Sequence, residues 1–318
     1  MKLFPFLDRS VQWEQGKVSE LLSILKMVLG SGICSGLVRS EASILTFSDS
    51  QVGQFFPISP HHDYIKLPSI AKNGPGNWQA THLWVSFPEI LQLRQQLISN
   101  VLLNYAPDIF LMDHMPHGTM GELLPALEAV DRAGVHTRNV LGLRDILDSP
   151  EVTINRWEVE GTYDVIEHYY ARILVFGMQD VYDVAEKYQL PESVAKKRSY
   201  CGYVSNLDSD RNAHNIRTRY LADKSADTLL IVVMAGGGVD AYPMMEQRTR
   251  AKLFRDRHWV DTIDPDELIS DNLAESISSH LMHPNRSKPS AFPNLNGAAV
   301  AAKHTLAVLA SKKERVPT

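Results

Sequence analysis

The chain has 318 residues, of which 44% are hydrophobic and 22% charged, with a formal net charge of −5 and a sequence pI of about 6.2. This balance is typical of a globular protein of one or two domains, and the net negative charge gives no reason to expect a nucleic-acid partner, which would favour a basic stripe. The two cysteines, Cys34 and Cys201, stand far apart, so the sequence favours a reducing, cytoplasmic location over a disulfide framework.

The N-terminal region lacks the pattern of a secretory signal, because charged residues interrupt any apolar run: Asp8, Arg9, Glu14 and Lys17. The most hydrophobic stretch, residues 18–38, contains Glu20 and Lys26 and is too polar to span a membrane. A helix lying on a membrane surface is the alternative for this stretch, so peripheral membrane contact stays among the expected partners.

From residue 42 onward, short apolar runs alternate with segments of helical spacing, which is typical of a parallel sheet with crossover helices. Strands are expected at residues 42–47, 64–67, 108–113, 139–143 and 172–177. Helices are expected at residues 87–105, 121–133, 156–170 and 181–188. The sequence therefore predicts an α/β fold with a Rossmann-like N-terminal domain.

The alternation ends near Cys201, and the polar stretch that follows it is typical of a linker. Thr228–Met234 then predicts a second buried strand, and helices are expected after it at residues 246–255, 267–281 and 297–309. We predict an N-terminal domain over residues 1–204, a linker over 205–227 and an incomplete C-terminal domain over 228–318.

A cluster of polar residues and glycines follows the strand expected at residues 108–113. It comprises Asp113, His114, His117, Gly118, Gly121 and Glu122. Open α/β sheets bind ligands outside the carboxyl ends of their strands, and a histidine beside a carboxylate suits proton transfer near neutral pH. We expect Asp113, His114 and Glu122 to be catalytic, and His117, Gly118 and Gly121 to bind substrate. In the alternative, Asp113 and Glu122 only cap the following helix.

Arg144 and Asp145 follow the next strand and are expected at the same edge of the sheet. The guanidinium of Arg144 could bind a phosphate or carboxylate of a substrate. The alternative is that Arg144 pairs internally with Asp145 or Asp148 and only fixes the loop.

A glycine-rich turn, Gly236 to Gly238, follows the strand expected at Thr228–Met234. Such a turn lets a phosphate approach backbone N–H groups at a helix N-terminus. It does not match the dinucleotide pattern G-x-G-x-x-G, and a simple tight turn is the alternative. Further on, Glu246 and Arg250 are four residues apart on an expected helix, and spacing alone favours a surface pair.

Neither metal-binding nor cofactor-binding spacing is found. His61 and His62 are adjacent and would point in different directions on a strand, and His114 with His117 alone is a weak signal. The sequence therefore predicts no metal and no cofactor.

Taken together, these segments resemble a bacterial group of predicted glycosyltransferases with the GT-B fold, related to family 28 and to the peptidoglycan N-acetylglucosaminyltransferase. The resemblance extends from about Glu41 to Tyr242, resumes at Glu246, and runs on through the stretch beginning at Trp259. Its more specific segments begin at Asp113, with D-H-x-P-x-G-x-x-G-E-L, and at Gly142, with G-L-R-D-I-L-D.

The resemblance implies two Rossmann-like domains facing each other across a cleft. The N-terminal domain would hold an acceptor, which the sequence does not identify, and the C-terminal domain a nucleotide sugar, most readily a UDP-sugar. Transfer of a hexose or N-acetylhexosamine would need no metal. In related enzymes a Glu and Gln pair contacts the donor, and Glu246 and Gln247 match that pair. The glycine loop of Gly236, Gly237 and Gly238 is expected to bind the nucleotide sugar as well.

Two departures from the family pattern point to a catalytically inactive remnant that binds or regulates. The glycines around Leu29 lack the expected histidine, and no strand is expected before them. Tyr242 is joined almost directly to Glu246, which leaves the second domain short. A metal-dependent hydrolase built on Asp113, His114, His117 and Asp145 is a further alternative, while the glycine pattern argues against a dehydrogenase.

Overall fold

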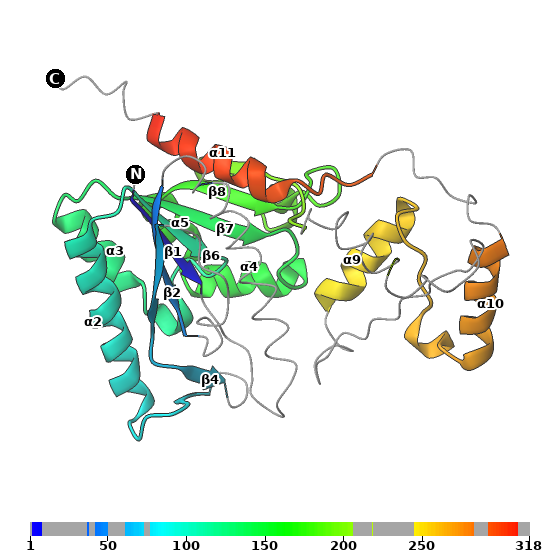
Figure 1. The fold of residues 1–318 in the computed structure, drawn as a ribbon, viewed down its shortest axis with the longest axis horizontal. Coiled ribbons are helices and arrows are strands. Elements are labelled where there is room, and N and C mark those ends of the chain that lie inside the picture. Colours follow the sequence, from blue (N-terminus) through cyan, green and yellow to red (C-terminus); the bar gives the residue numbers. More distant parts are fainter. Residues whose placement is uncertain are drawn as a thin grey trace.

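A seven-stranded sheet forms the centre of the protein (Figure 1). The computed structural model describes residues 2–7, 37, 42–49, 61–72, 77–205, 218, 245–282 and 292–310. The strands of the sheet are β1 (Lys2–Leu7), β2 (Ser43–Ser48), β3 (His62–Lys66), β6 (Ile109–Asp113), β7 (Arg138–Arg144), β8 (Tyr170–Phe176) and β9 (Arg198–Tyr200). Neighbouring strands are parallel throughout, in the order β3-β2-β1-β6-β7-β8-β9.

This strand order is that of a doubly wound α/β fold. The chain runs outward from β1 to β3, returns to place β6 beside β1, and continues outward to β9. The direction reverses between β1 and β6, and such switch points are where open α/β sheets bind their ligands. The α/β class and the Rossmann-like character predicted for the N-terminal domain are confirmed.

The N-terminal strand corrects one expectation. The sequence predicts no strand before Leu29, yet β1 pairs with β2 on one side and β6 on the other. The apolar run that forms β1 is short and contains Pro5, which lacks the N–H that a central strand normally donates. The sequence pattern is therefore weak at this interior strand of the sheet, next to its middle strand β6.

Helices cover both faces of the sheet. On one face, α2 (Phe87–Tyr105), α3 (Leu124–Arg132) and α5 (Thr162–Tyr169) bury apolar side chains against Phe110 and Met112. On the other face, α11 (Gly297–Ala310) packs Ala301 and Val308 with Ile109 and Leu111 of β6. The alternation along β6 follows the two-residue period of a strand, so both faces of the sheet are core.

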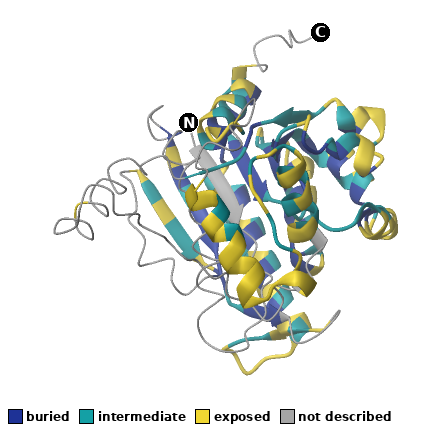
Figure 2. Cartoon of the chain, turned by 90° about the vertical axis from the view of Figure 1, so that its right-hand side faces the viewer, coloured by how far each residue is buried: buried dark blue, intermediate teal, exposed yellow. Residues whose placement is uncertain are grey.

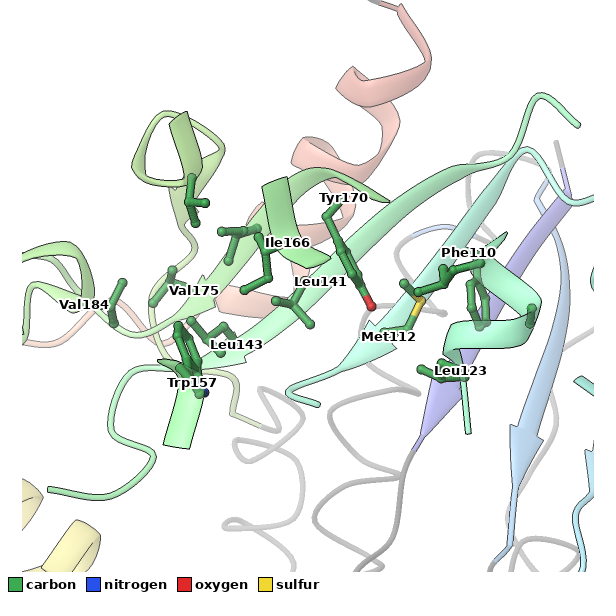
Figure 3. Packing of buried hydrophobic residues seen from close by; sticks show 14 of the residues in the cluster. Phe110, Met112, Leu123, Leu141, Leu143, Trp157, Ile166, Tyr170, Val175 and Val184 are labelled. Atoms are coloured by element: carbon green, nitrogen blue, oxygen red, sulfur yellow. The ribbon is translucent and has the colours of Figure 1, made fainter. Parts of the chain in front are cut away.

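The burial of residues follows the same layers. Buried residues concentrate in the strands and on the inner faces of the helices, with exposed residues outside (Figure 2). In the core, the ring of Tyr170 reaches toward Met112, while Leu141 and Leu143 of β7 lie near Ile166 and Trp157 (Figure 3). α11 crosses the opposite face beside β8 (Figure 1).

Several predicted elements have different bounds in the structure. The helix expected at residues 156–170 is two helices, α4 (Pro150–Val159) and α5, separated where Gly161 takes a left-handed conformation with φ of 64°. The helix expected from Gly121 begins instead as a 3-10 turn, η2 (Thr119–Gly121), before α3. Smaller elements are β4 (Ile70–Lys72), β5 (Trp78–Ala80), α6 (Val184–Lys187) and α7 (Glu192–Ala195).

The C-terminal part that the structure describes is helical. It contains α9 (Met245–Asp256), η3 (Pro265–Glu267), α10 (Ser270–Met282) and α11, close to the helices expected there. The strand expected at Thr228–Met234 lies outside the described residues. α11 falls in the range predicted for the C-terminal domain but packs on the N-terminal sheet. No helix among the described residues is long and apolar enough to cross a membrane.

Candidate functional site

The carboxyl edge of the sheet gathers polar side chains from three strands. Asp49 follows β2, Asp113 and His114 end β6, and Arg144 with Asp145 ends β7. Because all these strands are parallel, their carboxyl ends meet at one edge, next to the switch point between β1 and β6. The predicted site residues that follow these strands therefore lie at the carboxyl edge of the sheet.

Asp113 and His114 form the polar centre of this edge. The Oδ2 atom of Asp113 and the Nδ1 atom of His114 are 3.4 Å apart, and the side chains are 15% and 18% exposed. His114 Nδ1 itself is buried, with no hydrogen-bond partner among the described residues. The backbone of His114 has a φ of 23° and its N–H donates to the Gly142 carbonyl over 2.6 Å. A non-glycine residue in such a conformation is strained, and strain of this kind gathers at functional sites.

The turn after His114 is fixed by backbone hydrogen bonds. The N–H of Gly118 donates to the Met115 carbonyl over 2.9 Å, and that of Leu123 to the His117 carbonyl over 2.8 Å. The buried hydroxyl of Tyr170 donates to the Pro116 carbonyl over 2.6 Å, which ties the turn to β8. The loop that follows Asp113 and His114 is thus fixed by its own hydrogen bonds and by the hydrogen bond from Tyr170 in the core.

Replacing Gly118 with Ala is expected to destabilise the protein. Gly118 has a φ of 69°, and a Cβ there would lie 2.7 Å from Leu123 Cγ and 2.8 Å from Glu122 Cγ. We expect the free energy of unfolding to fall by about 2–4 kcal/mol, from backbone strain and overpacking together. Chemical denaturation measures this.

Gly134 provides the matched control, because it has a φ of 64° and a Cβ added there would meet nothing within 4 Å. Gly134→Ala should carry only the strain of the left-handed backbone, about 1 kcal/mol. Equal losses for the two variants would mean that the turn at Gly118 is not tightly packed.

Glu122 lies in the interior rather than at the edge. Its carboxylate accepts two hydrogen bonds from Arg94 of α2, at 2.5 Å from Nε and 3.0 Å from Nη2. The side chains of both residues are almost wholly buried, at 1% and 0% exposed. Arg94 also lies 3.5 Å from Asp49 and donates to the Pro68 carbonyl. The buried pair with Arg94 gives the Glu122 carboxylate a role in holding the site loop, and its expected catalytic role stays a prediction.

His117 lies near Glu160, at the end of α4. Burial lowers the pKa of its imidazole, and the negative charge of Glu160 partly offsets that effect. His117 Nε2 is buried without a hydrogen-bond partner among the described residues. The lowered pKa favours the neutral form of the His117 imidazole.

Acidification is expected to destabilise the fold. The pKa values of His62, His117 and His304 are each lowered, chiefly because burial disfavours the charged imidazole. The unfolded chain takes up protons near the ordinary pKa of 6.5, before the native state does. Stability is therefore complete above that value and is lost as the pH falls below it.

Chemical denaturation at about pH 7.5 and pH 5.5 measures this dependence. His117→Gln should reduce the difference between the two pH values, because the variant has no group to protonate at that position. An unfolding free energy that rises on acidification would contradict the account.

Arg144 and Asp145 point into an ion-pair network with α9. Asp145 Oδ1 accepts from Arg250 Nη2 over 2.9 Å and from the Ile146 N–H over 2.8 Å. Arg144 Nη1 lies 4.0 Å from Glu246. The expected internal partners of Arg144 are Asp145 or Asp148, and the observed partner is neither of them. The expected pair between Glu246 and Arg250 is present at 3.1 Å.

For the remaining predicted site residues, the structure describes fewer contacts or none. Gln247 is exposed on α9, and Gly236, Gly237 and Gly238 lie outside the described residues. Gly121, with a φ of 79°, ends η2 within the site turn. Across the residues described here, no three His, Cys, Asp or Glu side chains are grouped to hold a metal.

Three residues of the site escape prediction from the sequence: Arg94, Asp49 and Arg250. Arg94 sits among apolar residues of α2 at the helical period, and a cation on a buried helix face requires a counter-charge, which is a usable signal. Arg250 carries no such signal, because its partner Asp145 is 105 positions away in sequence.

The fold and its polar carboxyl edge define a doubly wound α/β protein. No family model matches the chain, and no curated protein matches its sequence.

Among solved structures, UDP-GlcNAc 2-epimerase from Methanocaldococcus jannaschii aligns at 15% identity over 97% of this chain and 82% of its own, with a TM-score of 0.41. A glycosyltransferase from Rickettsia africae ESF-5 aligns at 9% identity over 98% and 96%, with a TM-score of 0.43. Alr3699/HepE from Anabaena, in complex with UDP-glucose, aligns at 13% identity over 69% and 49%, with a TM-score of 0.36. All three TM-scores are below 0.5, so the fold assignment rests on the strand order of this chain.

Proposed function

We propose that the chain is a nucleotide-sugar-dependent glycosyltransferase of the GT-B type, with its acceptor bound above the carboxyl ends of β1 and β6. The observation that carries the proposal is the Asp113 and His114 pair at the switch point, 3.4 Å apart and partly exposed. A doubly wound sheet binds ligands at this point, and a carboxylate beside an imidazole is suited to removing a proton there.

Proton removal is the step that Asp113 and His114 would perform. The carboxylate favours a proton on the Nδ1 side of the imidazole that faces it, which leaves Nε2 as the proton acceptor. The acceptor hydroxyl gives its proton to this base as its oxygen bonds to the anomeric carbon of the sugar. The bond from that carbon to the diphosphate breaks, and the nucleoside diphosphate leaves with the electron pair.

The transition state of such a transfer has oxocarbenium character, with negative charge growing on the leaving diphosphate. Backbone N–H groups of the Gly236 to Gly238 turn would stabilise that charge, which requires no metal. We propose a UDP-sugar as donor, carrying a hexose or an N-acetylhexosamine, with Glu246 and Gln247 contacting it.

A second candidate function is a non-catalytic binding or regulatory protein. It is favoured by the engagement of two predicted ligand-binding carboxylates, Asp145 and Glu246, with the same Arg250. In such a remnant these contacts would only hold α9 in place.

A UDP-release assay tests the proposal. The full chain is incubated with UDP-glucose or UDP-N-acetylglucosamine and a panel of hydroxyl acceptors, with and without a chelator. We expect acceptor-dependent UDP release that the chelator leaves unchanged. Release that the chelator abolishes would favour the metal-dependent hydrolase, and no release with any pair would favour the non-catalytic protein.

A further inference from the structure

We infer that Arg250 is a positioning residue: held by Asp145 at the end of β7, it docks α9 on the carboxyl edge of the sheet and orients Glu246 for the donor. This inference rests on the proposed function for the role of Glu246. It assigns Asp145, expected to bind substrate, to the docking of a helix.

The contacts form a chain of alternating charge. Arg250 donates from Nη2 to Asp145 Oδ1 over 2.9 Å and from Nη1 to Glu246 Oε1 over 3.1 Å. The other oxygen of Glu246, Oε2, lies 4.0 Å from Arg144 Nη1. Two cations and two carboxylates therefore balance, and the planar fork of one guanidinium links the sheet to α9.

Asp145 is a rigid anchor for this chain. Its side chain is only 2% exposed, and the backbone N–H of Ile146 holds the same oxygen that Arg250 contacts. The carboxylate occupies space that only a glycine at position 177 leaves open, since a Cβ there would lie 2.5 Å from Asp145 Cβ. A buried carboxylate is costly without a partner, so burial itself favours the docked position of Arg250.

One face of α9 carries its contacts with the sheet. Glu246, Arg250 and Phe254 follow one another at intervals of four residues, which places them on one side of the helix, and Arg257 follows directly after its end. Phe254 packs edge-on against Tyr203, just after β9, with ring centroids 5.4 Å apart. Arg257 donates to the carbonyl of Asp180 in the loop after β8. The docked face thus spans the ends of three neighbouring strands.

Docking fixes the direction of Glu246 without using up its acceptor capacity. Each carboxylate oxygen offers two lone pairs, and Oε1 gives only one of these to Arg250 in the contacts described. The side chain is 13% exposed, so part of it faces outward. Loss of Arg250 or of Asp145 would free the Glu246 side chain to rotate. Donor binding would then have to offset the conformational entropy that is lost when this side chain is ordered again.

Four variants test the inference: Asp145→Asn, Arg250→Met, Arg250→Lys and the double variant Asp145→Asn/Arg250→Met. The matched control is Arg255→Met on the same helix, because the Arg255 side chain is 51% exposed and is 3.9 Å from Asp256. Hydrogen exchange of α9, followed by mass spectrometry in the full chain, reports docking whether or not the protein is an enzyme.

We expect α9 amides to exchange about tenfold faster in Asp145→Asn and in Arg250→Met, and no faster in the double variant than in the worse single one. Arg255→Met should exchange as the wild type does. With a UDP-sugar, both single variants should raise the donor KM about tenfold and change kcat less, with partial rescue by Arg250→Lys.

The outcomes separate the two proposals. Unchanged α9 exchange in Asp145→Asn and Arg250→Met would overturn the docking role. Faster exchange together with an unchanged donor KM would overturn the positioning of Glu246. Faster exchange in these variants, with a wild type that releases no UDP from any donor, would leave the docking intact and remove the glycosyltransferase proposal.

Discussion

Replacing Asp113 with Asn is expected to lower the rate of sugar transfer by about 10²- to 10⁴-fold while leaving the fold intact. The amide keeps the shape of the side chain, which is 15% exposed at the end of β6. It removes the negative charge that faces His114 Nδ1, and with it the preference for an imidazole able to accept a proton at Nε2. Transfer rates and circular dichroism, measured on the same preparation, test the two halves of the prediction.

Asp164→Asn is the control for Asp113→Asn, because Asp164 is an exposed residue in the first turn of α5, outside the site. It should transfer sugar at the wild-type rate. Normal turnover by Asp113→Asn would remove Asp113 from the mechanism, and an unfolded variant would assign it a structural role instead.

Replacing Arg94 with Met is expected to lower the free energy of unfolding by about 3–5 kcal/mol, since removal of one partner of a buried ion pair strands the other. Arg94 is 1% exposed and forms ion pairs with Glu122, at 2.5 Å, and with Asp49, at 3.5 Å. Both carboxylates would remain in the interior. The substitution should also disturb the candidate site, because Glu122 lies at the end of the turn that begins at His114. Chemical denaturation gives the loss of stability.

The exposed pair of Arg132 and Glu128 on α3 provides the comparison, with atoms 2.8 Å apart and side chains 75% and 49% exposed. Arg132→Met should cost about 0–0.5 kcal/mol. Adding Glu122→Met to Arg94→Met should recover part of the loss by removing one stranded charge. A loss for Arg94→Met as small as that for Arg132→Met would show that the buried pair does not stabilise the loop.

Elements with a complete local signal were predictable from sequence. The expected helix at residues 87–105 coincides with α2, where apolar spacing agrees with a capping box of Ser86 and Glu89. The expected strand at residues 108–113 agrees with β6 because four consecutive apolar residues are buried on both faces. The helix expected at residues 156–170 is divided by Gly161, whose left-handed backbone is compatible with glycine and interrupts the periodicity.

The site was predictable only in part, because only some of its residues are placed by a local sequence signal. Asp113 and His114 directly follow a strand, so chain order alone puts them at the carboxyl edge. Glu122 stands eight positions later, and only the packing of α2 decides that Arg94 encloses it. Asp145 likewise meets Arg250 through tertiary structure, because the two lie 105 positions apart. Sequence order gives strand ends, whereas the direction of a side chain depends on contacts from distant elements.

Calorimetric titration of the full chain with UDP-glucose and UDP-N-acetylglucosamine tests the central claim most directly. We expect saturable binding of at least one of them below millimolar concentration, weakened by Arg250→Met and little changed by Arg255→Met. Absence of any heat of binding at millimolar ligand would contradict a nucleotide-sugar site in this chain and favour a non-catalytic role.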